Sequence, residues 1–252
     1  MLQSERQRES QFINGRVARL RIGDPTAPDF VAERVHVRYR IGLGGLEVRS
    51  VILTRPILRA QLRQGRFHVG ALDPLVKEFL SRPPRPDVAQ PRVQVDDGVL
   101  ALATAYGPVR RTADALVADG TLMRLAAASA PVRLRGQGFD MELGAGALRA
   151  ATRGDRVDVS LNAPVVRAAA GESVVEDGRL AVTAQIPYPD LQRRRGDGAV
   201  VARLDLTGRR RTAGAQVLED AALTASLTGK VTGWIPDLAV SGPATASLRA
   251  QR

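Results

Sequence analysis

The chain has 252 residues, of which 44% are hydrophobic and 25% charged, and its formal net charge is +11. These are values of an ordinary folded protein, and they exclude a largely disordered chain. There is no cysteine, which excludes disulfides, thiolate catalysis and cysteine-based zinc sites. Lys77 and Lys230 are the only lysines among 37 basic residues. Such an arginine bias is typical of a GC-rich genome, so the charge alone does not predict nucleic-acid binding.

Apolar and polar residues alternate along most of the chain. The alternating segments are 35–41, 58–62, 132–135, 157–161, 180–186, 200–206, 223–227 and 244–248. Because successive side chains of a strand point to opposite faces of a sheet, each predicted strand has one apolar and one polar face. Pairs such as Asp97-Gly98 and Asp177-Gly178 resemble hairpin turns between these runs. The pattern predicts a mainly β fold, an elongated and curved antiparallel sheet.

A short helix is predicted near 73–80, in the sequence DPLVKEFL. Asp73 is placed to cap it, and Pro74 fits the first helical position. The segment 82–91 is rich in proline, which a ladder strand does not tolerate. We therefore expect a region of strands plus the helix at 1–81, a connector at 82–91, and a continuing β-groove of hairpins at 92–252, with both regions in one continuous sheet.

A weak internal repeat links residues 95–102 with residues 175–182, since both contain an acidic pair, a glycine and an apolar alternation. Two explanations are open. Any protein built of hairpins reuses Asp-Gly turns, and a sheet extended by stacking similar hairpins would show the same likeness.

Searches for catalytic chemistry find no convincing constellation. His36 and His68 have no partner at metal-ligand spacing, and no phosphate-binding, dinucleotide or nucleophile-elbow motif is present. The acidic pairs Asp96/Asp97 and Glu176/Asp177 are interpreted as turn residues. We therefore predict a protein that is not an enzyme and that needs neither a metal ion nor a cofactor.

Two arginine clusters, 193–195 and 209–211, lie in segments that look like loops. Solvated loops are the plain interpretation, and anionic lipid headgroups or an acidic protein are the alternative partners. Nucleic acid is not expected as a partner, because few aromatic residues are available to stack on bases.

The apolar face of the predicted sheet needs a cover, and one short helix is too little. Either two halves close as a sandwich, or the sheet curls into a trough that holds hydrocarbon. In the second case, acyl chains would lie against a set of residues from several strands. These candidate groove residues are Val51, Leu53, Leu58, Ala60, Leu62, Leu100, Leu102, Leu180, Val182, Leu204 and Leu206.

Residues 46–80 resemble the N-terminal region of AsmA-like proteins, particularly the YdbH kind and its relatives of the TamB group. A strand ends in Arg55-Pro56, a second strand follows, and a glycine turn leads to a short leucine-rich helix. Residues 91–102 are similar to the next strand of that family, and 104–109 fit the turn after it. The likeness is clearest over 30–125.

Membership of this family would imply a taco-shaped β-groove that carries phospholipid between inner and outer membranes. It would also imply a periplasmic location, an association with the inner membrane, and outer-membrane or other envelope proteins as further partners. One related domain carries a dicarboxylate-transport label, which an apolar groove does not support. No apolar run here reaches the ~18–20 residues of a membrane helix, which departs from the pattern of the family. A chain this short could not bridge two membranes alone, so we expect it to be one section of such a conduit. The alternative function is a structural or scaffold β-sandwich of the cell envelope.

Overall fold

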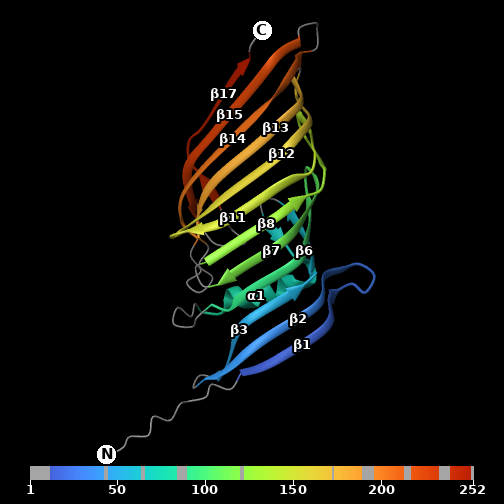
Figure 1. Ribbon diagram of the computed structural model, residues 1–252, viewed down its shortest axis with the longest axis vertical. Coiled ribbons are helices and arrows are strands. Elements are labelled where there is room, and N and C mark those ends of the chain that lie inside the picture. The colour runs from blue at the N-terminus through green and yellow to red at the C-terminus, as the bar shows by residue number, and fades with distance from the viewer. Residues whose placement is uncertain are drawn as a thin grey trace, which may run out of the picture.

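The computed structural model describes residues 12–42, 45–63, 66–83, 90–119, 122–171, 173–188, 196–212, 217–232 and 239–250. Within them the chain is mainly β, and its strands form one curved sheet of 17 strands with one short α-helix (Figure 1). The sheet is mixed but largely antiparallel. This confirms the fold class predicted from the alternating pattern.

The elements follow one another along the chain with mostly short connections. They are β1 (Phe12–Gly23), β2 (Pro28–Gly42), β3 (Gly45–Thr54), β4 (Ile57–Arg63), β5 (Arg66–His68), the 3-10 turn η1 (Gly70–Leu72), α1 (Asp73–Ser81), β6 (Arg92–Thr104), β7 (Gly107–Asp119), β8 (Leu122–Ser129), β9 (Val132–Gly136), β10 (Phe139–Leu143), β11 (Gly146–Arg153), β12 (Arg156–Ala170), β13 (Ser173–Pro187), β14 (Gly198–Thr212), β15 (Val217–Thr232), β16 (Ala239–Ser241) and β17 (Ala244–Ala250).

Most neighbours along the chain are also neighbours in the sheet. β1, β2 and β3 pair antiparallel, and so do β6, β7 and β8 and then β11 to β15. β6 departs from this order and also from the antiparallel pattern, since it runs parallel to both β3 and β4. β5, η1 and α1 lie between β4 and β6 and carry the chain back, as a parallel connection requires. This crossover joins residues on both sides of the Pro-rich connector into one sheet; residues 84–89 of that connector lie outside the described residues.

A line of irregular positions crosses the strands and divides the sheet into two limbs. β3 and β4 are separated by Arg55 and Pro56, and the pairing of β6 with β7 skips Asp97 and Asp114. Farther along, the pairing of β12 with β13 skips Asp177. Arg55, Asp97 and Asp177 have φ values of 46°, 52° and 50°, the left-handed conformation that β-bulges use. We call this line the crease.

The crease corrects two sequence interpretations. Asp97-Gly98 and Asp177-Gly178 are not hairpin turns, because each lies inside a long strand, β6 or β13. The acidic pairs Asp96/Asp97 and Glu176/Asp177 therefore lie inside strands, and of the two only Glu176/Asp177 adjoins a register shift, the one between β13 and β14. The internal repeat accordingly marks two crossings of the same crease.

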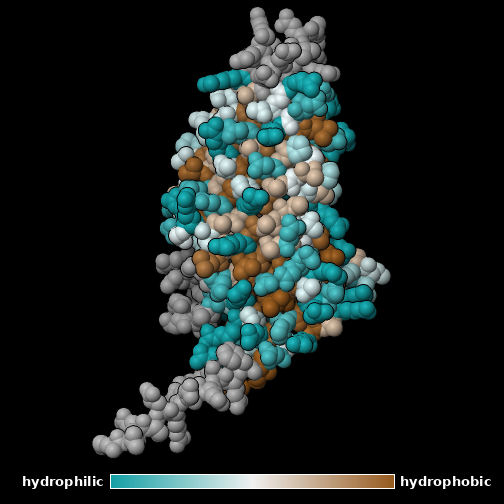
Figure 2. Space-filling model, viewed as in Figure 1, coloured by the Kyte–Doolittle hydropathy of each residue, from teal (hydrophilic) through white to brown (hydrophobic). Residues whose placement is uncertain are grey.

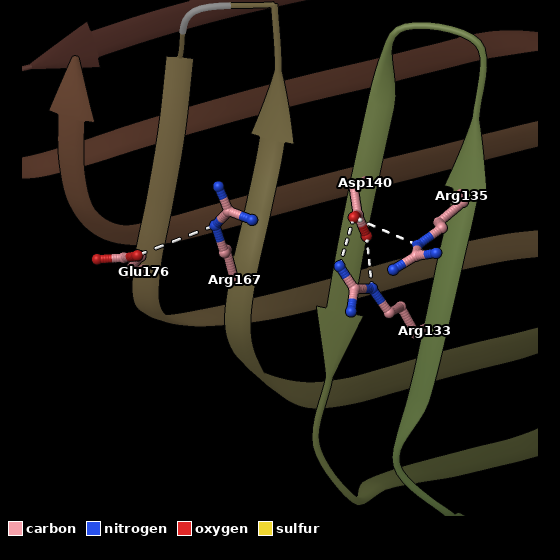
Figure 3. A network of polar contacts seen from close by, with 5 residues as sticks. All are labelled: Arg133, Arg135, Asp140, Arg167 and Glu176. Carbon is pink, nitrogen blue, oxygen red and sulfur yellow. Dashed lines mark hydrogen bonds and ion pairs between the residues drawn. The ribbon is translucent and has the colours of Figure 1, made fainter. Parts of the chain in front are cut away.

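The limbs are defined by their side of the crease. β3 lies in the long limb, and β4, β5, β9 and β10 lie in the short limb; longer strands such as β2, β6, β8 and β12 pass through both. Figure 3 shows this bending, with strands turning sharply and continuing behind the foreground segments. Bulges increase local twist and bend a strand, so a row of them folds a sheet on itself.

Helix α1 confirms the prediction at 73–80 and ends one residue later. The predicted cap is wrong, because Asp73 is the first helical residue and its Oδ1 instead accepts the Val69 N–H at 2.7 Å. The apolar stripe of the helix faces water: Leu75 is 55% exposed and Phe79 47%. This helix does not cover the apolar face of the sheet.

Candidate apolar groove

The inward face of the sheet is built from apolar residues aligned across successive strands. One row, which we call the Leu53 row, runs from β1 to β15 through paired positions. Its members are Val17, Val35, Leu53, Val95, Leu116, Leu125, Ala150, Val159, Ala184, Ala202 and Leu227. Because residues paired directly opposite each other on neighbouring strands share a face, all of these lie on one side of the sheet.

A second row crosses the first half of the sheet on the short-limb side of the crease. We call it the Leu58 row, and its paired members are Phe30, Leu58, Leu100, Arg111, Ser129 and Gly146. The second half of the sheet has a similar row of paired residues on the long-limb side of the crease, namely Ala163, Leu180, Leu206 and Leu223. The folded sheet brings such rows from the two limbs toward each other.

In the first half, the fold forms a partly open apolar pocket of ≈ 310 Å³. Leu53 and Val95 line it from the long limb, Leu58 and Leu100 from the short limb, and Pro56 from the crease. The remaining lining residues are Phe30, Gly98, Val99, Arg111, Ala113, Leu116, Leu125, Ala127 and Leu148. The volume lies at the lower end of the usual range for ligand pockets.

In the second half, side chains of the protein itself fill the fold. Leu143 of β10 and Val165 of β12 pack with Leu180 and Leu206 of the long limb, and these four side chains are between 1% and 8% exposed. Val132, Met141, Ala168, Val182, Leu204 and Leu223 pack around them. This part of the interior is a closed hydrophobic core.

The predicted groove residues divide between these two environments. Leu53, Leu58 and Leu100 line the pocket, whereas Leu180 and Leu206 belong to the core cluster, with Val182 and Leu204 packed against it. Val51 and Leu62 are half-buried strand residues outside both sets. Ala60 and Leu102 line a different hollow of ≈ 830 Å³ together with Asp29, Arg59 and Arg110, which occupy the alternate, polar positions of their strands.

Several pocket residues lie outside the predicted set, including Phe30, Leu116, Leu125 and Arg111. Leu116 follows the bulge at Asp114, which shifts the alternation by one residue. Arg111 does carry a signal, because it stands between Val109 and Ala113 in a run where alternation leads one to expect an apolar residue.

The opposite face of the sheet is polar and rich in ion pairs. On the short limb, Asp140 accepts two hydrogen bonds from Arg133, at 3.0 and 2.6 Å, and lies 3.4 Å from Arg135 (Figure 3). The hydrogen bond from Arg133 holds the pKa of Asp140 below its ordinary value. Nearby, Arg167 pairs with Glu176 at 4.0 Å. Figure 2 likewise shows a visible face on which hydrophilic residues are spread between hydrophobic ones.

The arginine cluster 209–211 belongs to strand β14 rather than to a loop, and Arg209 lies 3.4 Å from Asp177 at the crease. The cluster 193–195 lies outside the described residues. Similar pairing joins Arg203 to Asp205 on the long limb, where their hydrogen bond lowers the pKa of Asp205. Several guanidinium groups on this face are therefore engaged with carboxylates.

The described residues offer no constellation for metal chemistry. No group of three or more metal-ligating side chains gathers among them. His68 lies 3.7 Å from Asp73, and His36 is half-buried on the polar alternation of β2. No described helix is long and apolar enough to cross a membrane.

Comparisons with known proteins add no relative. No protein-family model matches the chain, and neither a curated protein nor a solved structure is significantly similar to it. The likeness to AsmA-like proteins therefore rests on the sequence motifs quoted above.

Proposed function

We propose that this protein is a non-enzymatic lipid-transfer module, and that its apolar groove carries phospholipid acyl chains through the periplasm between the inner and outer membranes. The observation that carries the proposal is the apolar pocket between the limbs, which opens within rows of apolar residues that continue from strand to strand. The two membranes and the periplasmic location in this proposal are taken from the resemblance to AsmA-like proteins.

The physical chemistry of the pocket suits hydrocarbon. Burial of apolar surface contributes about 25 cal/mol per Å², and the pocket lining is dominated by leucine, valine and alanine. Typical strands span ~17–20 Å, while the acyl layer of one leaflet is ~15 Å, half of the hydrocarbon core. An acyl chain can therefore lie along the inward face without leaving it.

The central test places a charge in the pocket. Leu58→Asp puts a carboxylate among apolar neighbours at a half-buried position. We expect the variant to lose most of its uptake of fluorescent phospholipid from vesicles, because an acyl chain would have to desolvate the carboxylate. Circular dichroism should show the same β content as the parent protein.

The matched control is Gln61→Asp. Gln61 stands on the same strand, is exposed and occupies the alternate, polar position. It lines the separate hollow of ≈ 830 Å³ and not the apolar pocket, so the same charge is added outside that pocket. The control should transfer lipid like the parent. If the parent takes up no phospholipid, or if Leu58→Asp transfers as well as Gln61→Asp, the lipid proposal is wrong.

The scaffold function has one observation in its favour, the closed core formed by Leu143, Val165, Leu180 and Leu206. That core holds the limbs together as the two layers of a sandwich are held. Native mass spectrometry separates the two functions: co-purified phospholipid supports the carrier, and a protein that stays free of lipid after incubation with vesicles supports the scaffold.

A further inference from the structure

One cation stands on the inward face of the first half of the sheet. Arg111 lies on β7 and is paired with Leu100 on one side and Ser129 on the other. It lines the apolar pocket. Its inward neighbours along β7 are Val109 and Ala113, so Ser129 is the one polar side chain among its paired and inward neighbours.

This guanidinium is incompletely satisfied. Its Nη1 atom is buried, and no described residue gives it a hydrogen-bond partner. Ser129, the nearest polar neighbour in the row, accepts the Gly146 N–H at 3.0 Å. Burial lowers the pKa of Arg111 below its ordinary value, although an arginine stays charged at every physiological pH.

A buried donor on a charged group without an acceptor destabilises a folded protein, and leucine or methionine would fit the row better. The described members of the Leu53 and Leu58 rows contain no acidic residue that could pair with Arg111. An acceptor supplied by a ligand would complete the site, since guanidinium binds phosphate and carboxylate oxygens through paired hydrogen bonds.

We propose that Arg111 binds the phosphodiester of an anionic phospholipid whose acyl chains occupy the adjoining pocket. The inference rests on the proposed lipid-carrying function and adds the class of headgroup. A zwitterionic headgroup would bring its ammonium next to Arg111 without a carboxylate to receive it, so charge complementarity favours a headgroup with a net negative charge. The phosphodiester is chosen because phospholipid is the proposed cargo.

The experiment compares uptake of phosphatidylglycerol and phosphatidylcholine from otherwise identical vesicles. The parent protein should prefer phosphatidylglycerol by about tenfold. Arg111→Met keeps much of the aliphatic stem and removes the charge; it should lose the preference, retain phosphatidylcholine uptake, and melt at the same or a higher temperature than the parent. Arg111→Lys keeps the charge without the planar fork and should retain only part of the preference.

The control is Arg110→Met, which removes the same charge from the adjacent residue. Arg110 is exposed and stands on the polar alternation of β7. Surface attraction of a protein with net charge +11 to anionic vesicles is therefore reduced equally in both variants. Uptake is measured at high salt, which screens exposed charges much more than buried ones. Arg110→Met should keep the preference.

The outcomes separate the two proposals. A parent that takes up both lipids equally, with Leu58→Asp still inactive, overturns the assignment of Arg111 and leaves the carrier function standing. A parent that takes up neither lipid overturns both. If oleate binding depends on Arg111 while the protein does not prefer phosphatidylglycerol over phosphatidylcholine, Arg111 binds a carboxylate and the phosphodiester assignment is wrong. An equal loss of preference in Arg110→Met and Arg111→Met also contradicts the proposal.

Discussion

The two halves of this folded sheet share one strand pattern and fill their interiors differently. In the first half, residues at or near the crease are small: Gly98, Ala113 and Ala127 all line the pocket. In the second half, Leu143, Leu180 and Leu206 meet across the crease and exclude solvent. A repeated β architecture can therefore contain a binding volume and a stabilising core side by side, and the size of the residues near the bend decides which one forms.

The two halves should also contribute differently to the free energy of unfolding. Close-packed interiors lose stability when atoms are removed, because a cavity remains. A pocket that already contains unfilled space loses less, since most of its lining side chains are only half-buried in the absence of a guest. We therefore expect the second half to dominate the free energy of unfolding and the first half to dominate ligand binding.

The largest effect should come from truncating the closed core. Leu180 is 6% exposed and belongs to the buried cluster, so Leu180→Ala should cost about 2–5 kcal/mol of unfolding free energy. Its counterpart is Leu100→Ala in the pocket. Leu100 is half-buried, and its truncation should cost about 1 kcal/mol, part of the burial value of a leucine.

Urea titration followed by circular dichroism measures both costs, and vesicle uptake assays measure the functional effect. Leu100→Ala should lower lipid uptake strongly and the free energy of unfolding only slightly. Leu180→Ala should lower the free energy of unfolding strongly and lipid uptake only slightly. Equal destabilisation by the two substitutions would show that the pocket is as tightly packed as the core.

The sequence predicted the strands well, because period-two alternation depends on local residues and survives any global arrangement. Segments 58–62 and 200–206 are strands with the expected apolar faces. It could not predict the crease, since Asp-Gly is equally suited to a hairpin turn and to a bulge, and only pairing with distant strands decides between them. The parallel placement of β6 likewise depends on the path of the whole crossover.

The candidate site was predicted only in part for the same reason. Alternation identifies which residues share a face, so Leu53, Leu58 and Leu100 were found. Whether a residue on that face meets a neighbour or empty space depends on how far the two limbs approach each other. Leu180 and Leu206 were accordingly predicted as groove residues, although they lie in the core; their predicted contact with lipid stays untested.

An intermediate effect is expected from the glycines of the two Asp-Gly pairs at the crease. A Cβ at Gly178 would collide with the backbone carbonyl of Thr207 on the neighbouring strand, which cannot move without disturbing the ladder. A Cβ at Gly98 would instead meet Val95 Cγ1 at 2.6 Å, a side-chain atom beside the pocket. Gly178→Ala should therefore cost about 1–3 kcal/mol, and Gly98→Ala should cost less.

Thermal melting of the two variants measures this difference. The pocket half has space into which Val95 can shift, whereas the β13–β14 ladder has none. A larger loss of stability from Gly98→Ala than from Gly178→Ala would contradict the view that the first half is the more adaptable one.

The smallest effect should come from the polar network on the outer face of the closed half. Asp140 is held by the hydrogen bonds of Arg133 and by the nearby charges of Arg133, Arg135 and Arg167, which together lower its pKa. Because the folded pKa lies below the unfolded one, the unfolded chain binds the proton more readily. The stabilisation is complete above the ordinary aspartate pKa and is lost as the pH falls through the lower, folded pKa.

Asp140→Asn should therefore melt slightly below the parent protein at neutral pH, and the difference should shrink as the solution is acidified toward the folded pKa. Asp155→Asn, which removes a carboxylate from the exposed turn between β11 and β12, is the control for net charge. Lipid uptake should be unchanged in both variants, since Asp140 points away from the apolar rows. A loss of uptake in Asp140→Asn alone would show that the outer network of the closed half controls how far the pocket half opens, and the two halves would then have to be treated as one coupled unit.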